Sequence, residues 1–127
     1  MSRPIQIEHI AIAVKDLESS LKFYVEQLGL VCTGYETVES EQVRTAFLQI
    51  GQSHLELLEA ISSHSPIAKF IEKHGEGIHH LALSVENLAE YVAKLKEKGV
   101  QPVYETPKIG ANNSLITFLH PQQTGGV

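Results

Sequence analysis

Cysteine is nearly absent from this sequence: Cys32 is the single cysteine among 127 residues. One cysteine cannot form an intramolecular disulfide, and no second cysteine is present to complete a Cys-x-x-Cys motif. A disulfide framework is therefore excluded. We expect Cys32 to be a small buried or half-buried side chain that follows the first helix.

Positively charged residues are also few. The chain has 10 lysines and arginines against 15 aspartates and glutamates, which gives a net charge of -5. Proteins that bind nucleic acids need basic patches to displace counterions from phosphates, so we expect no nucleic-acid partner. An anionic small molecule remains compatible with this charge, because a bound metal ion can reverse the electrostatic field inside a pocket.

Long hydrophobic runs are missing as well, whereas a membrane helix needs about 20 mostly apolar residues. The opening residues, MSRPIQIEHIAIAVKD, carry Glu8 and His9 within a short apolar stretch, which is not typical of a signal peptide. We therefore expect a cytoplasmic protein without a membrane partner. Its length and its 43% hydrophobic content suit a single domain, residues 1–127, with one hydrophobic core.

What the sequence does contain is an internal repeat with a constant offset of 71 residues. The segment Ile7–Leu17 reads IEHIAIAVKDL, and the segment Ile78–Leu88 reads IHHLALSVENL. This repeat predicts two copies of one βαβββ unit. The predicted limits are about 5–60 for the first copy, about 65–75 for a linker helix and about 77–127 for the second copy.

Each copy opens with a strand in which bulky and small side chains alternate. We expect the bulky face to pack on a helix, and the small face, which also carries one histidine, to line a cavity. The bulky residues are Ile10, Ile12 and Val14 in the first copy and Leu81, Leu83 and Val85 in the second; the small faces hold His9, Ala11 and Ala13, and His80, Ala82 and Ser84.

A helix follows each of these strands. Asp16 and Asn87 are the expected N-cap residues, and Ser65-Pro66 is the expected start of the linker helix. Three β-rich runs then follow each repeat helix; in the first copy they lie near residues 30–38, 42–50 and 53–59. The sequence thus predicts an α+β fold in which two βαβββ repeats pair into a curved mixed sheet around a metal-containing cleft.

His9 and His80 occupy equivalent positions of the repeat, so twofold pairing of the copies would place them beside one shared cavity. Glu56 lies between Leu55 and Leu57 in HLELLE, where buried leucines would point the carboxylate to the opposite face. Two imidazoles and a carboxylate suit a divalent ion such as Co²⁺, Ni²⁺, Mn²⁺, Zn²⁺ or Fe²⁺ with open coordination positions. We therefore predict a metal site at His9, Glu56 and His80. The alternatives are structural histidines and an exposed glutamate at a sheet edge.

The other histidines are weaker ligand candidates. His79 alternates onto the packing face of its strand, and we expect it to be a packing residue. The remaining candidates start a strand, flank the linker helix or lie in a turn; they are His54, His64, His74 and His120.

Several segments of the sequence resemble methylmalonyl-CoA epimerases, a family of the vicinal oxygen chelate, or glyoxalase, superfamily. They are EHIAIAVKDLESSLKFY, HLELLEA, SPIAKFIEKHGEGIHHLALSV, YETPKIGA and FLHPQQTGGV. The strand with the first histidine is shared across the superfamily. The linker SPIAKFIEKHGEGIHH, with PKIG and FLHP after it, is more specific to the epimerases.

The resemblance implies an isomerase that interconverts (R)- and (S)-methylmalonyl-CoA through a metal-stabilised enolate, acting as a homodimer on an acyl-CoA substrate. It implies His9, Glu56 and His80 as ligands, with a further glutamate expected after Val127. A base found in some members falls near Thr45, whose hydroxyl cannot act as that base directly. The catalytic and substrate-binding residues are therefore not identified.

Two alternatives remain open. Glyoxalase I, which acts on a glutathione hemithioacetal, uses the same kind of metal site. A non-enzymatic protein that binds a small molecule without a metal would share the scaffold, although the presence of both histidines and Glu56 counts against it.

Overall fold

The computed structural model describes residues 3–110 and 113–127. The strands are β1 (Gln6–Ala13), β2 (Val31–Val38), β3 (Val43–Ile50), β4 (Ser53–Ala60), β5 (Gly77–Ser84), β6 (Lys108–Ile109) and β7 (Leu115–Ile116). The helices are α1 (Leu17–Leu21), α2 (Pro66–His74), α3 (Leu88–Glu97) and α4 (Pro121–Thr124), with a π-helical segment η1 (Lys22–Gln27) and a 3₁₀ turn η2 (Glu39–Glu41).

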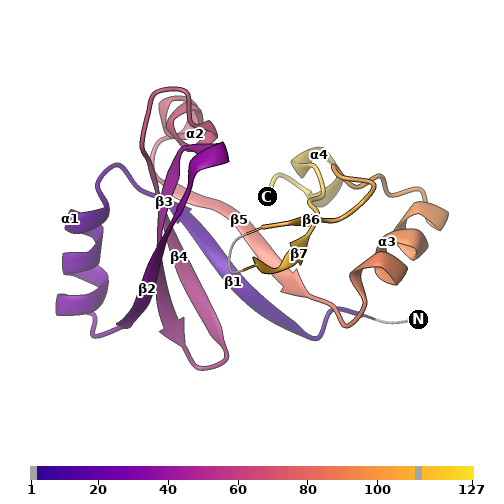
Figure 1. Ribbon diagram of the computed structural model, residues 1–127, viewed down its shortest axis with the longest axis horizontal. Coiled ribbons are helices and arrows are strands. Elements are labelled where there is room, and N and C mark those ends of the chain that lie inside the picture. Colours follow the sequence, from indigo (N-terminus) through magenta and orange to yellow (C-terminus); the bar gives the residue numbers. More distant parts are fainter. Residues whose placement is uncertain (1–2, 111–112) are drawn as a thin grey trace. The chain divides into compact units, whose positions relative to one another are not determined.

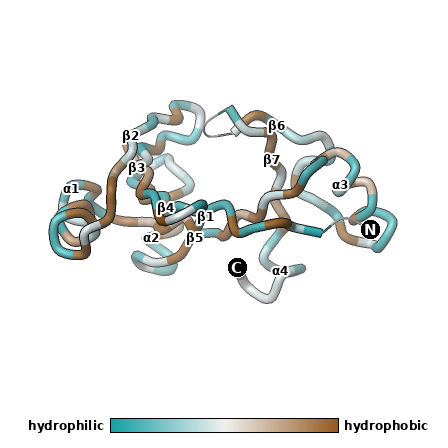
Figure 2. The backbone as a smooth tube through the Cα atoms, turned by 90° about the horizontal axis from the view of Figure 1, so that it is seen from below, coloured by the Kyte–Doolittle hydropathy of each residue, from teal (hydrophilic) through white to brown (hydrophobic). Residues whose placement is uncertain are grey.

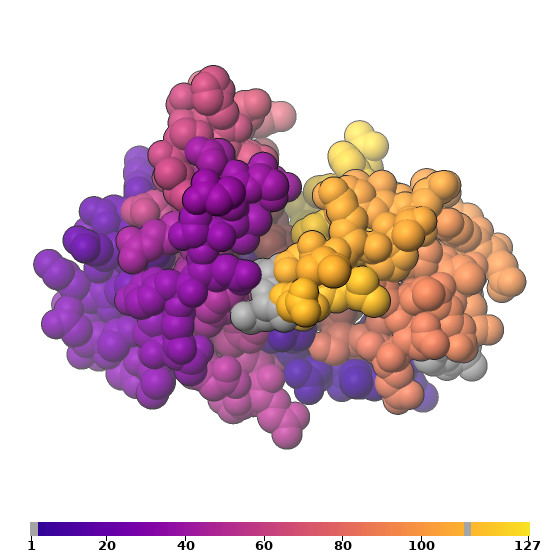
Figure 3. All heavy atoms as spheres, viewed as in Figure 1, coloured from indigo at the N-terminus to yellow at the C-terminus, as the bar shows by residue number. Residues whose placement is uncertain are grey.

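The chain divides into two compact units. One, the sheet unit, is Ile7–Leu83, and the other, the C-terminal unit, combines Met1–Gln6 with Ser84–Val127. In Figure 3 the purple and pink atoms of the sheet unit close into one continuous body. The sheet unit contains nearly all of the first repeat, the linker helix and most of the first strand of the second repeat.

Five strands form the mixed sheet, in the order β2-β3-β4-β1-β5 (Figure 1). β1 runs parallel to β4, whereas β3 is antiparallel to both β2 and β4. The first copy thus has the predicted βαβββ order, and its strands lie where the β-rich runs were expected. The mixed sheet confirms the predicted fold class.

Helical segments pack against two hydrophobic clusters of the sheet. Val14, Leu17 and Leu57 are buried in one cluster, against which the helical residues Leu21, Tyr24 and Val25 pack. The second cluster combines Ala11, Ala13, Val43, Leu58 and Ile67, with Phe70 and Ile71 of α2 packed against it. Ala11 and Ala13 therefore belong to a core and not to a cavity wall, because their small side chains leave room for Ile67 of α2.

The helix starts follow from the capping residues. Asp16 and Asn87 each accept a hydrogen bond from a backbone N–H three residues on, and Ser65 caps α2 ahead of Pro66. The first helix differs from expectation in its second half, where α1 widens into the π-helical η1. Leu28, at the end of this segment, is 56% exposed, whereas Leu21, Tyr24 and Val25 pack against a hydrophobic cluster of the sheet.

The C-terminal unit contains α3 and a short hairpin. Figure 2 shows hydrophobic residues recurring among hydrophilic ones along α3, as in an amphipathic helix. β6 and β7 pair through only two residues each, and an isolated bridge joins Pro102 to Leu119. Within the described residues, the long strands predicted for the second copy are thus reduced to short pairings. Pro102 and Pro107 lack the backbone N–H that a ladder needs.

The short α4 begins where a turn was expected. His120 is its N-cap, and its Nδ1 accepts a hydrogen bond from the backbone N–H of Gln122. Among the helices in the described ranges, none has the length and apolar character to cross a membrane.

Candidate metal centre

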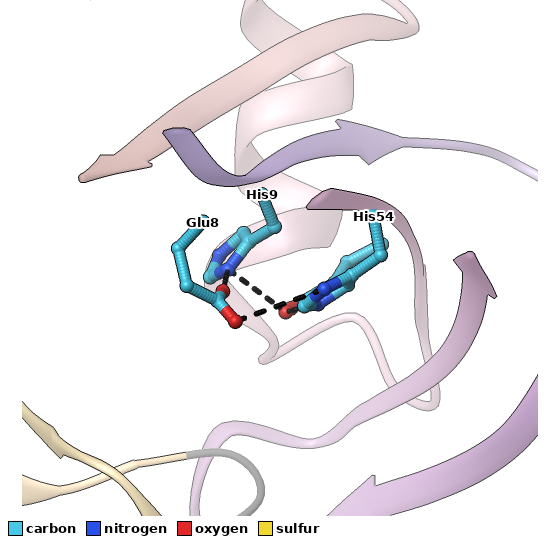
Figure 4. A group of neighbouring side chains, drawn as sticks. Glu8, His9 and His54 are labelled. Atoms are coloured by element: carbon cyan, nitrogen blue, oxygen red, sulfur yellow. Dashed lines mark hydrogen bonds and ion pairs between the residues drawn. The ribbon is translucent and has the colours of Figure 1, made fainter. Parts of the chain in front are cut away.

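The sheet register brings His9 beside β4. β1 pairs with β4 so that His9 lies opposite His54, and Ala11 lies opposite Glu56. His54 and Glu56 are two residues apart on β4 and therefore project from the same face. Figure 4 shows the side chains of Glu8, His9 and His54 turned toward one another.

One edge of the His9 ring meets carboxylates. Its Nδ1 is 3.1 Å from Oε2 of Glu56 and contacts the carboxylate of Glu8. The same Glu56 oxygen is 2.8 Å from Nε2 of His54. The ligand atoms of Glu8, His9, His54 and Glu56 all lie within 4.8 Å of one another, a grouping that can hold a metal ion.

The other edge of the His9 ring meets His80. The two Nε2 atoms are 3.2 Å apart, and the rings lie edge to face with centroids 5.3 Å apart. The structure thus brings His9, Glu56 and His80 into one group of side chains. The two contacts lie on opposite sides of the His9 ring, however: Glu56 contacts Nδ1 of His9, whereas His80 contacts Nε2 of His9.

The two Nε2 atoms are suitably spaced for one ion. Metal–imidazole bonds are about 2.0–2.1 Å, which puts two nitrogens on one ion roughly 3.0–3.4 Å apart. The 3.2 Å separation between His9 and His80 fits this range. A carboxylate at the other nitrogen of a ligating histidine, as Glu56 is placed, orients the ring and raises its basicity. The donor set therefore suits a divalent cation.

Burial keeps the second histidine neutral. Desolvation, together with smaller contributions from His79 and His9, lowers the pKa of His80 to about 3. Burial also lowers the pKa of His79. A neutral imidazole has the free electron pair that a metal ligand needs, so His80 is in the right state near neutral pH.

Glu56 is the most buried member of this group. Its side chain is 7% exposed, compared with 42% for Glu8. The alternative of an exposed glutamate at a sheet edge is wrong, because β4 is the central strand of the sheet. A buried carboxylate needs partners, and here His9 and His54 supply them.

Sequence reasoning underrated His54 and did not consider Glu8. The signal for His54 was available, since a residue two positions before Glu56 on a strand shares its face. Glu8 could not be found in this way, because strand alternation assigns it to the face opposite His9. Thr45, near the expected family base, is buried in β3 between Glu36 and Leu58 of the neighbouring strands.

His79 packs as expected, but it has a second contact. Its ring lies edge to face on Phe70 of α2, with centroids 4.8 Å apart. Its Nδ1 is also 2.9 Å from Nδ1 of His80. His74 lies on the same aromatic ring, 4.9 Å from Phe70.

The chain belongs to the glyoxalase/bleomycin resistance protein/dioxygenase superfamily, whose sequence profile matches residues 8–118. Within this superfamily, several of its relatives are named methylmalonyl-CoA epimerases. The ethylmalonyl-CoA/methylmalonyl-CoA epimerase of Cereibacter sphaeroides is 35% identical over 95% of this chain and 92% of that protein.

Solved structures agree with this relationship. A Streptomyces coelicolor methylmalonyl-CoA epimerase in complex with 2-nitronate-propionyl-CoA is 37% identical, with a TM-score of 0.92 over 98% of this chain and 91% of that one. A methylmalonyl-CoA epimerase in complex with methylmalonyl-CoA and NH₄⁺ gives the same identity, coverage and TM-score. The resemblance to methylmalonyl-CoA epimerases inferred from the sequence is thereby confirmed.

Proposed function

We propose that this chain is an epimerase that interconverts (R)- and (S)-methylmalonyl-CoA with the help of a divalent metal ion in the site of His9, Glu56 and His80, where Nε2 of each histidine would bind the ion and Glu56 would orient His9. The observation that carries the proposal is the pair of imidazole Nε2 atoms 3.2 Å apart beside a buried glutamate. The relatives named as methylmalonyl-CoA epimerases support the substrate.

The reaction removes the proton from the carbon between a thioester and a carboxylate and returns a proton to the opposite face. A bound divalent ion would supply Lewis acidity toward the thioester carbonyl. Three side chains of the protein form the site for this ion. His9 and His80 present Nε2 atoms to one point, and Glu56 holds His9 from its Nδ1 side.

The ligand types restrict the ion. Neutral imidazoles and a carboxylate, without thiolates, suit Co²⁺, Ni²⁺, Mn²⁺ or Zn²⁺. We expect close to one such ion per chain in protein purified without chelators. Elemental analysis that finds no metal, together with no uptake of added Co²⁺, would contradict the metal site and favour the non-enzymatic binding protein.

The activity is tested by α-proton exchange. Methylmalonyl-CoA incubated with the protein in deuterated water should acquire deuterium at the α-carbon, and removal of the metal should abolish this exchange. In parallel, the protein is given the hemithioacetal of methylglyoxal and glutathione. Turnover of the hemithioacetal without exchange on methylmalonyl-CoA would identify glyoxalase I instead.

Loss of a ligand tests the residues. His9→Ala and His80→Ala should each weaken Co²⁺ binding by more than about 100-fold, beyond the range usual for residues that only contact a ligand. The matched control is His64→Ala, which changes a histidine in the segment before α2. Unchanged Co²⁺ affinity in His80→Ala would remove His80 from the site.

A homodimer is part of the proposal. On the sheet unit, Leu81 and Leu83 project from the same face of β5 and are 44% and 52% exposed. Clustered exposed apolar residues of this kind mark protein interfaces. We expect a dimer by analytical ultracentrifugation and a shift toward monomer in Leu83→Lys. A monomeric wild-type protein at high concentration would refute it.

A further inference from the structure

His79 and His80 are adjacent residues of β5, and their rings contact each other through their Nδ1 atoms. The Nδ1 atoms are 2.9 Å apart, which is a hydrogen-bond distance. A neutral imidazole carries one proton, on either Nδ1 or Nε2. One of the two Nδ1 atoms must therefore carry a proton and the other must accept it.

The carboxylates decide the direction of this bond in the absence of metal. A carboxylate only accepts hydrogen bonds, so a neutral His9 that contacts Glu8 and Glu56 through Nδ1 carries its one proton there and has none on Nε2. His80 must then donate from Nε2 to His9 across the 3.2 Å contact. With its proton on Nε2, His80 accepts at Nδ1, and His79 is the donor.

A metal ion at the two Nε2 atoms requires the opposite arrangement at His80. Ligation through Nε2 takes the electron pair there, so a neutral His80 carries its proton on Nδ1. His79 must then accept this proton at Nδ1 and carry its own proton on Nε2. Each of the three imidazoles keeps one proton, and only the positions on His79 and His80 exchange.

We propose that His79 is a positioning residue for His80, and that the pair exchanges tautomers when a divalent ion replaces the proton between His80 and His9. The inference rests on the proposed metal site. The packing of His79 against Phe70 supports it, because this contact holds the ring in the orientation that keeps its Nδ1 beside His80. Partners of this kind, one step removed from the metal, typically change affinity by about 10–100-fold when they are lost.

Nitrogen-15 NMR of the histidine side chains tests the exchange directly. At a pH of about 8, above the ordinary histidine pKa, we expect His80 of the metal-free protein to carry its proton on Nε2. With Zn²⁺ bound, the proton should be on Nδ1 of His80 and on Nε2 of His79. A metal-free His80 that already has its proton on Nδ1 would overturn the exchange.

Two substitutions separate hydrogen bonding from packing. The amide of His79→Asn can donate and accept near the position of Nδ1, whereas His79→Leu can do neither. We expect Zn²⁺ affinity to fall by about 10–100-fold in His79→Leu and by much less in His79→Asn. His74→Leu is the control, because His74 contacts the same Phe70 ring. Equal losses in Asn and Leu variants, or none in either, would refute the positioning role.

Zn²⁺ binding by the wild-type protein and by His79→Leu distinguishes a failure of the metal site from a failure of this inference. If the wild-type protein bound no Zn²⁺, the metal site itself would be wrong. If it bound Zn²⁺ but His79→Leu left both the Zn²⁺ affinity and the tautomer of His80 unchanged, only the role of His79 would be wrong. Circular dichroism of each variant confirms that it is folded before these comparisons.

Discussion

β1 and β5 begin the two copies of the repeat and share the same alternation of side chains, yet their bulky faces have different surroundings. In β1, Ile12 is partly buried against the cluster that contains Val14 and Leu57. In β5, the equivalent Leu83 is 52% exposed, and Leu81 is 44% exposed. Alternation therefore assigned each residue to a face, but it did not determine whether that face is covered.

The difference between buried and exposed leucines predicts the largest effect. Leu57 is fully buried, so Leu57→Ala should lower the free energy of unfolding by about 2–5 kcal/mol. The matched Leu83→Ala should change it by no more than about 0.5 kcal/mol, as is usual for surface positions. Urea denaturation of monomeric protein measures both. A large loss in Leu83→Ala would show that β5 is covered as β1 is.

The two adjacent histidines of β5 predict a pH dependence. The pKa of His80 is lowered to about 3, and that of His79 is also lowered, so the unfolded chain binds more protons below the ordinary value of about 6.5. Their stabilising contribution is present above that pH and is lost as the pH falls from about 6.5 toward 3. One extra proton corresponds to about 1.4 kcal/mol per pH unit.

The measurement is urea denaturation of metal-free protein at several pH values, compared with His80→Gln. This variant has no imidazole to protonate at residue 80, so its stability should depend less steeply on pH over this range. The same slope in both proteins would contradict the assignment to His80.

The helix caps predict the smallest effect and compare the copies at equivalent positions. Asp16 accepts hydrogen bonds from the backbone N–H and the hydroxyl of Ser19, whereas Asn87 accepts one from the backbone N–H of Glu90. Replacement by alanine should cost about 1 kcal/mol at each cap. Asp16→Ala should cost the larger share, because a negative charge at a helix start is favourable. Hydrogen exchange of the first-turn amides would show it; a larger effect at Asn87 would contradict the expected order.

Much of the local structure was predictable from residues close together in the sequence. Caps at Asp16 and Asn87, Pro66 at the start of α2, and the period of two in β1 act over a few residues. The grouping of His9 with His80 was predictable for a different reason. The repeat places them at equivalent positions, and β1 and β5 lie side by side in the sheet.

Only the tertiary structure decided which neighbours each face meets. Ala11 and Ala13 were expected beside a cavity, but Ile67 of α2, far along the chain, covers them. His54 lies beside the candidate ligands because the β1–β4 register sets it opposite His9, and the ring of His79 contacts both His80 and Phe70 of α2. Local periodicity determines the direction of a side chain, whereas register and packing depend on long-range contacts that no short segment encodes.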